Sequence, residues 1–164
     1  MHGELWGVLS QQEADDFMAA AKVVSGQLDW IAGRDAAACK GWVEVGGARV
    51  GTVVFVASLE FDHWWSFNML LHGDEVYRLD IRPLGATPNH PNPWNRPEGF
   101  EKRVRGHIHE HIYIEGLGVE CARTVDRPIP IDHAAALCLF SELARSRFGV
   151  ACPTPPNVQY RMRY

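Results

Sequence analysis

The chain has 164 residues, of which 46% are hydrophobic, and its formal net charge is -4. A chain of this size can bury about two-thirds of its unfolded surface in one core, so we expect a single domain over residues 1–164. The acidic balance excludes a general electrostatic attraction to nucleic acid or to anionic membranes, and any such contact would need a local basic patch.

The four cysteines are scattered and include no C-x-x-C pair of the kind that specifies structural zinc. We therefore expect reduced thiols and a cytoplasmic location. Nowhere do about 18 consecutive apolar residues occur, so the sequence predicts no membrane segment. The N-terminus also lacks the basic and apolar regions of a secretion signal.

The first predicted element is a helix. Ser10 and Glu13 fit a capping box, in which each side chain bonds a free backbone amide at the start of a helix. Apolar residues then recur at helical spacing, and Gly26 is the expected end.

Between residues 28 and 71 the hydrophobic period becomes alternating, which predicts strands joined in a meander. Gly46-Gly47 can supply the positive φ angles of a tight hairpin turn. The next strand, residues 75–82, alternates apolar and polar side chains, and alternate residues of a strand share a face. Its polar stripe consists of Arg78, Asp80 and Arg82.

Residues 83–104 are rich in proline and asparagine. An irregular connection of this length is typical of a lid or binding loop, or of a disordered segment. Trp94 within it is either an anchor that fixes the loop or an exposed contact. Basic side chains gather toward its end, as far as Arg105.

The stretch 105–115 is the one around which we expect a site to be built. It is predicted to be a strand with three imidazoles on one face, those of His107, His109 and His111. If this strand pairs in antiparallel fashion with residues 75–82, those imidazoles meet the polar stripe, although sequence alone cannot fix the register.

The last predicted helix begins at the cap Asp132 and ends at Gly149. An extended basic tail, residues 153–164, follows it. We therefore predict an α+β fold: a single antiparallel sheet of about five to six strands, with the N-terminal and C-terminal helices packed on one face.

A histidine beside a carboxylate can transfer protons near neutral pH, and neighbouring arginines can bind a phosphate. Such a set suits cleavage of an RNA phosphodiester in which the 2'-hydroxyl attacks. Two imidazoles two residues apart can instead reach one metal ion, with a third ligand from Asp80 or His90. The third possibility is that these histidines line a solvent-exposed face of the sheet and take part in no reaction.

Three short motifs also resemble those of known proteins. Tyr77-Arg78-Leu79-Asp80, Asn92-Pro93 and His107-Ile108-His109 followed by Tyr113 resemble a group of small uncharacterised prokaryotic and phage proteins. More distantly, they are similar to the TumE-type toxins of toxin and antitoxin pairs. The resemblance implies a mobile-element setting, RNA as substrate and a possible cognate antitoxin, with Arg78, Asp80, His107 and His109 as the matched positions.

The sequence thus predicts a metal-independent, ribonuclease-like toxin with no cofactor. His109 is the expected general acid or base, His107 or His111 its partner, and Asp80 the orienting carboxylate. The expected substrate-binding residues are Arg78, Arg82, Arg105 and Trp94. Two alternatives stay open: a non-catalytic phage-encoded inhibitor, such as an anti-CRISPR protein, that binds a host nucleoprotein complex, and a metal-dependent hydrolase.

Overall fold

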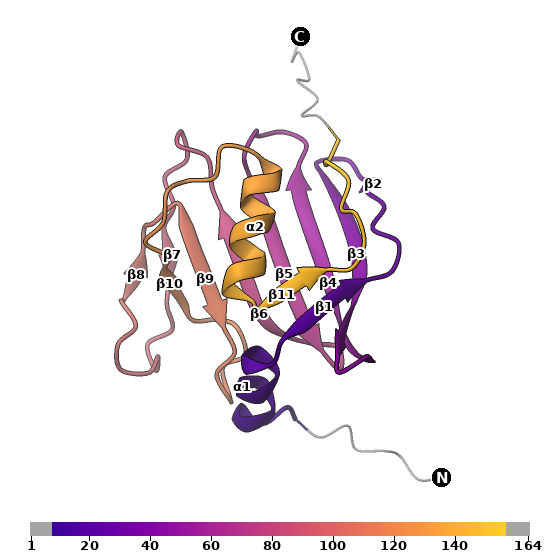
Figure 1. Cartoon of the computed structure of the whole chain (residues 1–164). Coiled ribbons are helices and arrows are strands. Elements are labelled where there is room, and N and C mark those ends of the chain that lie inside the picture. The colour runs from indigo at the N-terminus through magenta and orange to yellow at the C-terminus, as the bar shows by residue number, and fades with distance from the viewer. Residues whose placement is uncertain (1–7, 157–164) are drawn as a thin grey trace.

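The computed structural model describes residues 8–156, and in this range the chain folds around one large mixed sheet (Figure 1). The elements are α1 (Gln11–Ala19), β1 (Lys22–Ser25), β2 (Ile31–Ala32), β3 (Ala36–Val45), β4 (Ala48–Ser58), β5 (Trp65–Leu71), β6 (Asp74–Ile81), β7 (His90–Pro91), β8 (Arg103–Val104), β9 (Ile108–Ile112), β10 (Ala122–Thr124), α2 (His133–Leu143) and β11 (Ser146–Phe148). Across the same residues, neither helix is long and apolar enough to cross a bilayer.

The sheet has nine strands in the order β10-β9-β6-β5-β4-β3-β1-β11, with β2 also paired to β3. Strands β3 to β5 form the meander predicted for residues 28–71, and β6, predicted as the next strand, extends it. The hairpin turn between β3 and β4 is confirmed, because Gly46 and Gly47 have φ angles of 58° and 81° there. Strands β7 and β8 form a separate two-stranded ribbon.

The predicted single antiparallel sheet of five to six strands with helices on one face is wrong. The sheet is larger and mixed, because β1 and β11 pair in parallel, and both helices are shorter than expected. Both segments expected to continue a helix instead form strands: β1 pairs with β3, and β11 pairs with β1 at the edge of the sheet. The helix starts are confirmed: Ser10 and Glu13 form the capping box, and the Asp132 side chain accepts from the Ala135 amide.

Local contacts explain where the helices end. α1 ends at Ala19, not near Gly26, and the buried Lys22 ammonium donates to the carbonyl oxygens of Phe17, Met18 and Ala20 at 2.7, 3.0 and 2.7 Å. These bonds satisfy acceptors that a helix end leaves free. α2 ends at Leu143, and Arg145 then adopts a left-handed φ of 48°, which turns the chain into β11.

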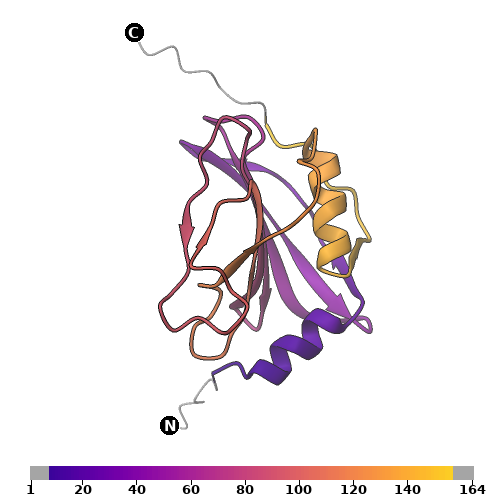
Figure 2. The same ribbon diagram turned by 90° about the vertical axis from the view of Figure 1, so that its left-hand side faces the viewer.

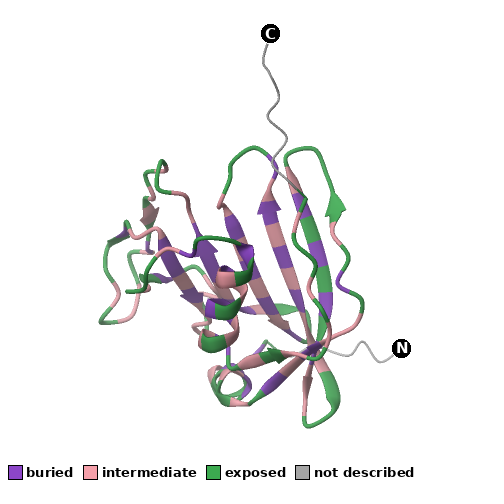
Figure 3. Cartoon of the chain, turned by 45° about the horizontal axis from the view of Figure 1, so that its top comes forward, coloured by how far each residue is buried: buried purple, intermediate pink, exposed green. Residues whose placement is uncertain are grey.

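The core lies on the face of the sheet that α2 covers, which we call the helix face. Buried and less buried residues alternate along the central strands, as Figure 3 shows. The fully buried rings of Phe55, Phe67 and Phe140 pack with centroids 5.3 to 5.5 Å apart. Apolar burial and edge-to-face or stacked ring contacts of this kind stabilise the core.

Residues 83–104 lie on the opposite face of the sheet from α2, which we call the pocket face (Figure 2). The segment is partly regular, because β7 and β8 pair within it. The buried Asn92 side chain ties it to β10: its amide donates to the carbonyls of Glu101 and Ala122, and its oxygen accepts from the Ala122 amide. Most of the predicted tail, from residue 157 on, lies outside the described residues.

Candidate functional site

The histidine strand and the Arg-Asp strand are direct neighbours. β6 and β9 pair in antiparallel fashion, with Asp80 opposite His109 and Arg78 opposite His111. The register that the sequence left open is therefore the one that brings these side chains together on the pocket face. β5 lies on the other side of β6 and places Ser66 opposite Asp80.

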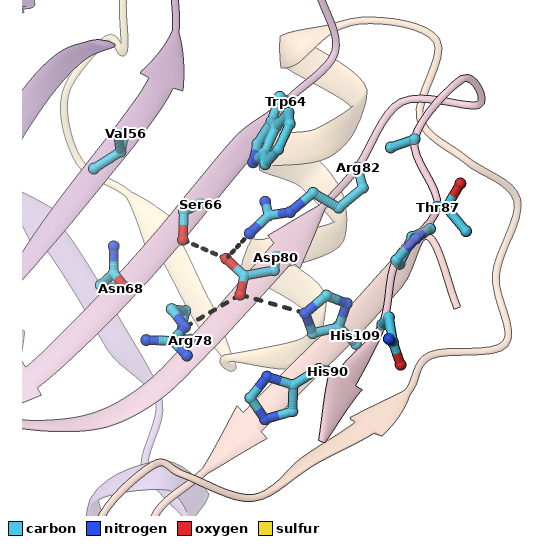
Figure 4. A pocket seen from close by; sticks show the side chains of 13 residues that line it. Val56, Trp64, Ser66, Asn68, Arg78, Asp80, Arg82, Thr87, His90 and His109 are labelled. Carbon is cyan, nitrogen blue, oxygen red and sulfur yellow. Dashed lines mark hydrogen bonds and ion pairs between the residues drawn. The ribbon is translucent and has the colours of Figure 1, made fainter. Parts of the chain in front are cut away.

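The Asp80 carboxylate is the centre of the cluster and is only 4% exposed. Its Oδ1 accepts a hydrogen bond from the Ser66 hydroxyl at 2.5 Å and lies 3.6 Å from Arg82 Nη2. Its Oδ2 lies 3.2 Å from Arg78 Nε. Figure 4 shows both arginines converging on this carboxylate from opposite sides.

Two imidazoles approach the same carboxylate oxygen. Nε2 of His109 lies 3.4 Å from Asp80 Oδ2, and Nε2 of His111 lies 3.2 Å from it. The other ring nitrogen faces a backbone carbonyl in both cases: His111 Nδ1 is 2.9 Å from the Val119 oxygen, and His109 Nδ1 is 3.3 Å from the Gly106 oxygen. Both rings are therefore held by two acceptors each.

Arg78 also contacts the His111 ring. Its Nη2 lies 3.1 and 3.2 Å from the two ring nitrogens. A nitrogen so nearly equidistant from both lies over the ring, since in the ring plane it would collide with the carbon between them. This guanidinium nitrogen therefore lies over the His111 ring, and the Nε2 atom of the ring remains close to Asp80.

The charges in the cluster explain its protonation. Burial alone would raise the pKa of the Asp80 carboxyl, but the contacts with His109 and His111, the positive charge of Arg82 and the Ser66 hydroxyl outweigh burial and hold the pKa well below its ordinary value. Asp80 is thus a carboxylate at neutral pH. Burial lowers the pKa of His111, and the nearby Asp80 opposes this only in part.

Above the cluster lies an open pocket of about 790 Å³ between the sheet and the loop. Its floor comes from the strands and its far wall from residues 86–90, as the close view shows (Figure 4). The lining residues are Val56, Trp64, Ser66, Asn68, Arg78, Asp80, Arg82, Ala86, Thr87, Pro88, Asn89, His90 and His109. The pocket is therefore rich in groups that bind anions.

Three of the expected site residues lie away from this cluster. Trp94 is 91% exposed and does not line the pocket, so it is not an anchor of the loop. Arg105 is exposed and also lies outside the pocket lining. His107 has a buried Nδ1 with no hydrogen-bond partner among the described residues and makes no ion pair with Asp80. The pair on the carboxylate is His109 and His111.

Sequence reasoning gave two pocket residues too little weight. His90 was considered only as a metal ligand, yet its ring lies 4.7 Å from His111 and 6.1 Å from His109 between centroids, and its Nε2 contacts the Glu120 carbonyl at 3.0 Å. Trp64 packs its ring against the Arg82 guanidinium at 4.6 Å. The signal for Trp64 was its position two residues before Ser66, because alternate residues of a strand share a face.

One group of atoms could also hold a metal ion. Within the described part of the chain, one ligand atom each from Asp80, His109 and His111 lies within 4.8 Å of the others. Comparison of the chain with family models, curated proteins and solved structures gave no match. The function is therefore inferred from this geometry.

Proposed function

We propose that the pocket binds RNA at a phosphodiester and cleaves it without a metal ion or other cofactor. The observation that carries this proposal is the set of pocket-lining charges. Two guanidinium groups, from Arg78 and Arg82, face a single carboxylate, Asp80, at the floor of an open pocket. Arginines bind phosphate oxygens with paired donors and stabilise the negative charge that develops during phosphoryl transfer.

Two imidazoles in the pocket supply the proton transfers. The His90 Nε2 proton is donated to the Glu120 carbonyl, so its Nδ1 keeps a lone pair and can act as the general base. His109, between Asp80 and the Gly106 carbonyl, has an acceptor at each ring nitrogen and suits the protonated ring of a general acid. Its ring is nearly parallel to that of His90, with an interplanar angle of 24°.

The reaction follows from these roles. His90 takes the proton of the RNA 2'-hydroxyl, the 2'-oxygen bonds to phosphorus, and the bond from phosphorus to the 5'-oxygen breaks. His109 gives its proton to that leaving oxygen. The products are a 2',3'-cyclic phosphate and a 5'-hydroxyl end, and Arg78 and Arg82 hold the phosphoryl oxygens throughout.

The test is cleavage of single-stranded RNA by protein kept in a chelator. His109→Ala should lower the rate by about 10²- to 10⁴-fold, the usual contribution of one acid or base, in a protein that circular dichroism shows to be folded. His72→Asn, at an exposed turn with a left-handed φ of 51° that Asn tolerates, is the matched control and should keep full activity. DNA of the same sequence should not be cleaved. Equal RNA cleavage by wild type and His109→Ala would remove the proposal.

One observation favours a second candidate, a non-catalytic inhibitor that binds a host nucleoprotein complex. Trp94 and Leu84, both in the segment 83–104, are 91% and 79% exposed. Exposed aromatic residues are frequent anchors of protein interfaces. In that case Trp94→Ala should weaken capture of the complex from a host lysate at least tenfold, whereas His109→Ala should change it little. The reverse result would exclude this candidate.

A further inference from the structure

We propose that Asp80, His109 and His111 form a binding site for one divalent transition-metal ion of the zinc class. The site goes beyond the proposed function, which uses no metal, and rests on part of the same cluster. An ion there would take the Nε2 position from which His109 gives its proton, so metal binding would silence RNA cleavage. The two proposals can fail independently.

The two distances between the Asp80 oxygen and the imidazole nitrogens fit an ion better than they fit hydrogen bonds. A zinc-class ion about 2.0 to 2.1 Å from each ligand in tetrahedral geometry keeps its ligands about 3.3 Å apart. The two distances from Asp80 Oδ2, 3.4 Å to His109 Nε2 and 3.2 Å to His111 Nε2, match that spacing. Charge-assisted N–H···O bonds are shorter, about 2.7 to 2.9 Å.

The contacts behind the two rings are those of metal-bound histidines. Such a ring donates its second N–H to a carbonyl or carboxylate, which fixes the tautomer and leaves the other nitrogen free to bind the ion. His111 Nδ1 at 2.9 Å from the Val119 oxygen, and His109 Nδ1 at 3.3 Å from the Gly106 oxygen, have this arrangement. In the metal-bound state the ring protons would lie on Nδ1, and both Nε2 lone pairs would face the ion beside Asp80 Oδ2.

The two oxygens of the Asp80 carboxylate have different neighbours, and one of them, Oδ2, is placed to bind the ion. Oδ1 is occupied by the Ser66 hydroxyl and faces Arg82, whereas Oδ2 faces both imidazoles. Arg78 is the competitor, because its Nε lies 3.2 Å from the same Oδ2. Its side chain is 28% exposed and lines the open pocket, so it can swing away when an ion enters.

Cobalt(II) titration of the metal-free protein tests the site, because visible absorption of cobalt reports tetrahedral coordination without any need for activity. Wild type should bind one ion per chain with intense bands that zinc abolishes. His111→Asn should lower the affinity at least tenfold, since it removes one of three ligands. Arg78→Met should raise it, roughly tenfold or more, because a positive charge next to the ligand oxygen disappears. His72→Asn is the control and should match wild type.

If circular dichroism shows that His111→Asn does not fold, the change in cobalt affinity caused by Arg78→Met still tests the metal site. Either of two results would overturn the metal site: wild type and Arg78→Met both lack a tetrahedral cobalt spectrum, or wild type and a folded His111→Asn bind cobalt equally well. Neither result would bear on RNA cleavage in chelator. Cobalt binding by a protein that cleaves no RNA in chelator would support the metal site and remove the proposed function instead.

Discussion

His133 predicts a specific pH dependence of stability. This first residue of α2 is 7% exposed, its Nε2 is buried with no hydrogen-bond partner among the described residues, and the rings of Trp30, Trp65 and Phe67 surround it with centroids 5.5 to 5.8 Å away. Burial in this apolar cage lowers the pKa of His133 from 6.5 to about 4, and the nearby Asp132 opposes the change only weakly.

The direction and the size of the change in stability with pH follow from proton linkage. Between about pH 6.5 and pH 4 the unfolded chain binds a proton at His133 that the folded chain does not, so stability falls as the pH falls through this window. The difference between 6.5 and about 4, at about 1.36 kcal/mol for each pH unit, corresponds to roughly 3 kcal/mol. Above the window this contribution is fully present, and below it the loss is complete.

His133→Phe removes the proton site and fills the same apolar cage. Urea unfolding of both proteins across this pH range should show the variant gaining on wild type by about 3 kcal/mol as the pH falls to 4. Other carboxyl and imidazole groups titrate in both proteins, so the difference between them isolates His133. Parallel curves for the two proteins over the whole window would refute the reasoning.

Two further substitutions test the scaffold around the pocket. Asn92→Ala removes two buried hydrogen bonds between the loop and β10 and a third within the loop, so we expect a loss of about 2 to 3 kcal/mol in urea unfolding and faster hydrogen exchange over residues 83–104. Unchanged exchange there would contradict this role. In Gly51→Ala the new Cβ would lie 2.1 Å from the Leu70 carbonyl oxygen, which forces β4 and β5 apart and should lower the free energy of unfolding by more than about 3 kcal/mol. Gly85→Ala is the control, because its Cβ meets no atom within 4 Å and stability should not change. Equal melting temperatures for the two variants would count against this packing.

The parts of the site that sequence could predict are those that depend on local alternation. The polar stripe of β6 and the imidazole stripe of β9 each follow from a period of two, and their pairing needed only that the strands be neighbours. Choosing between two overlapping H-x-H pairs was different. The resemblance matched His107 and His109, but the register places His109 and His111 on Asp80, and no local pattern carries that information.

The predicted fold class was wrong because two segments far apart in the sequence pair with each other. The residues after each helix were expected to continue it, but Lys22–Ser25 and Ser146–Phe148 pair with each other in parallel. The two segments are more than a hundred residues apart, and β11 has no strand partner other than β1 among the described residues. Two signals were present locally: Val23-Val24, β-branched residues that favour strands, and Lys22, whose ammonium caps α1.

The cost of the polar cluster argues that it is functional and not structural. Removing a carboxylate and two imidazoles from water is expensive, and a buried ionic group often stabilises a protein no better than apolar side chains of similar volume. The same two strands show the alternative on their helix face, where Leu79, Ile81 and Ile108 are buried in an apolar core. Asp80 and its partners are nevertheless concentrated under an open pocket that the loop covers, which is where a ligand could compensate for their burial.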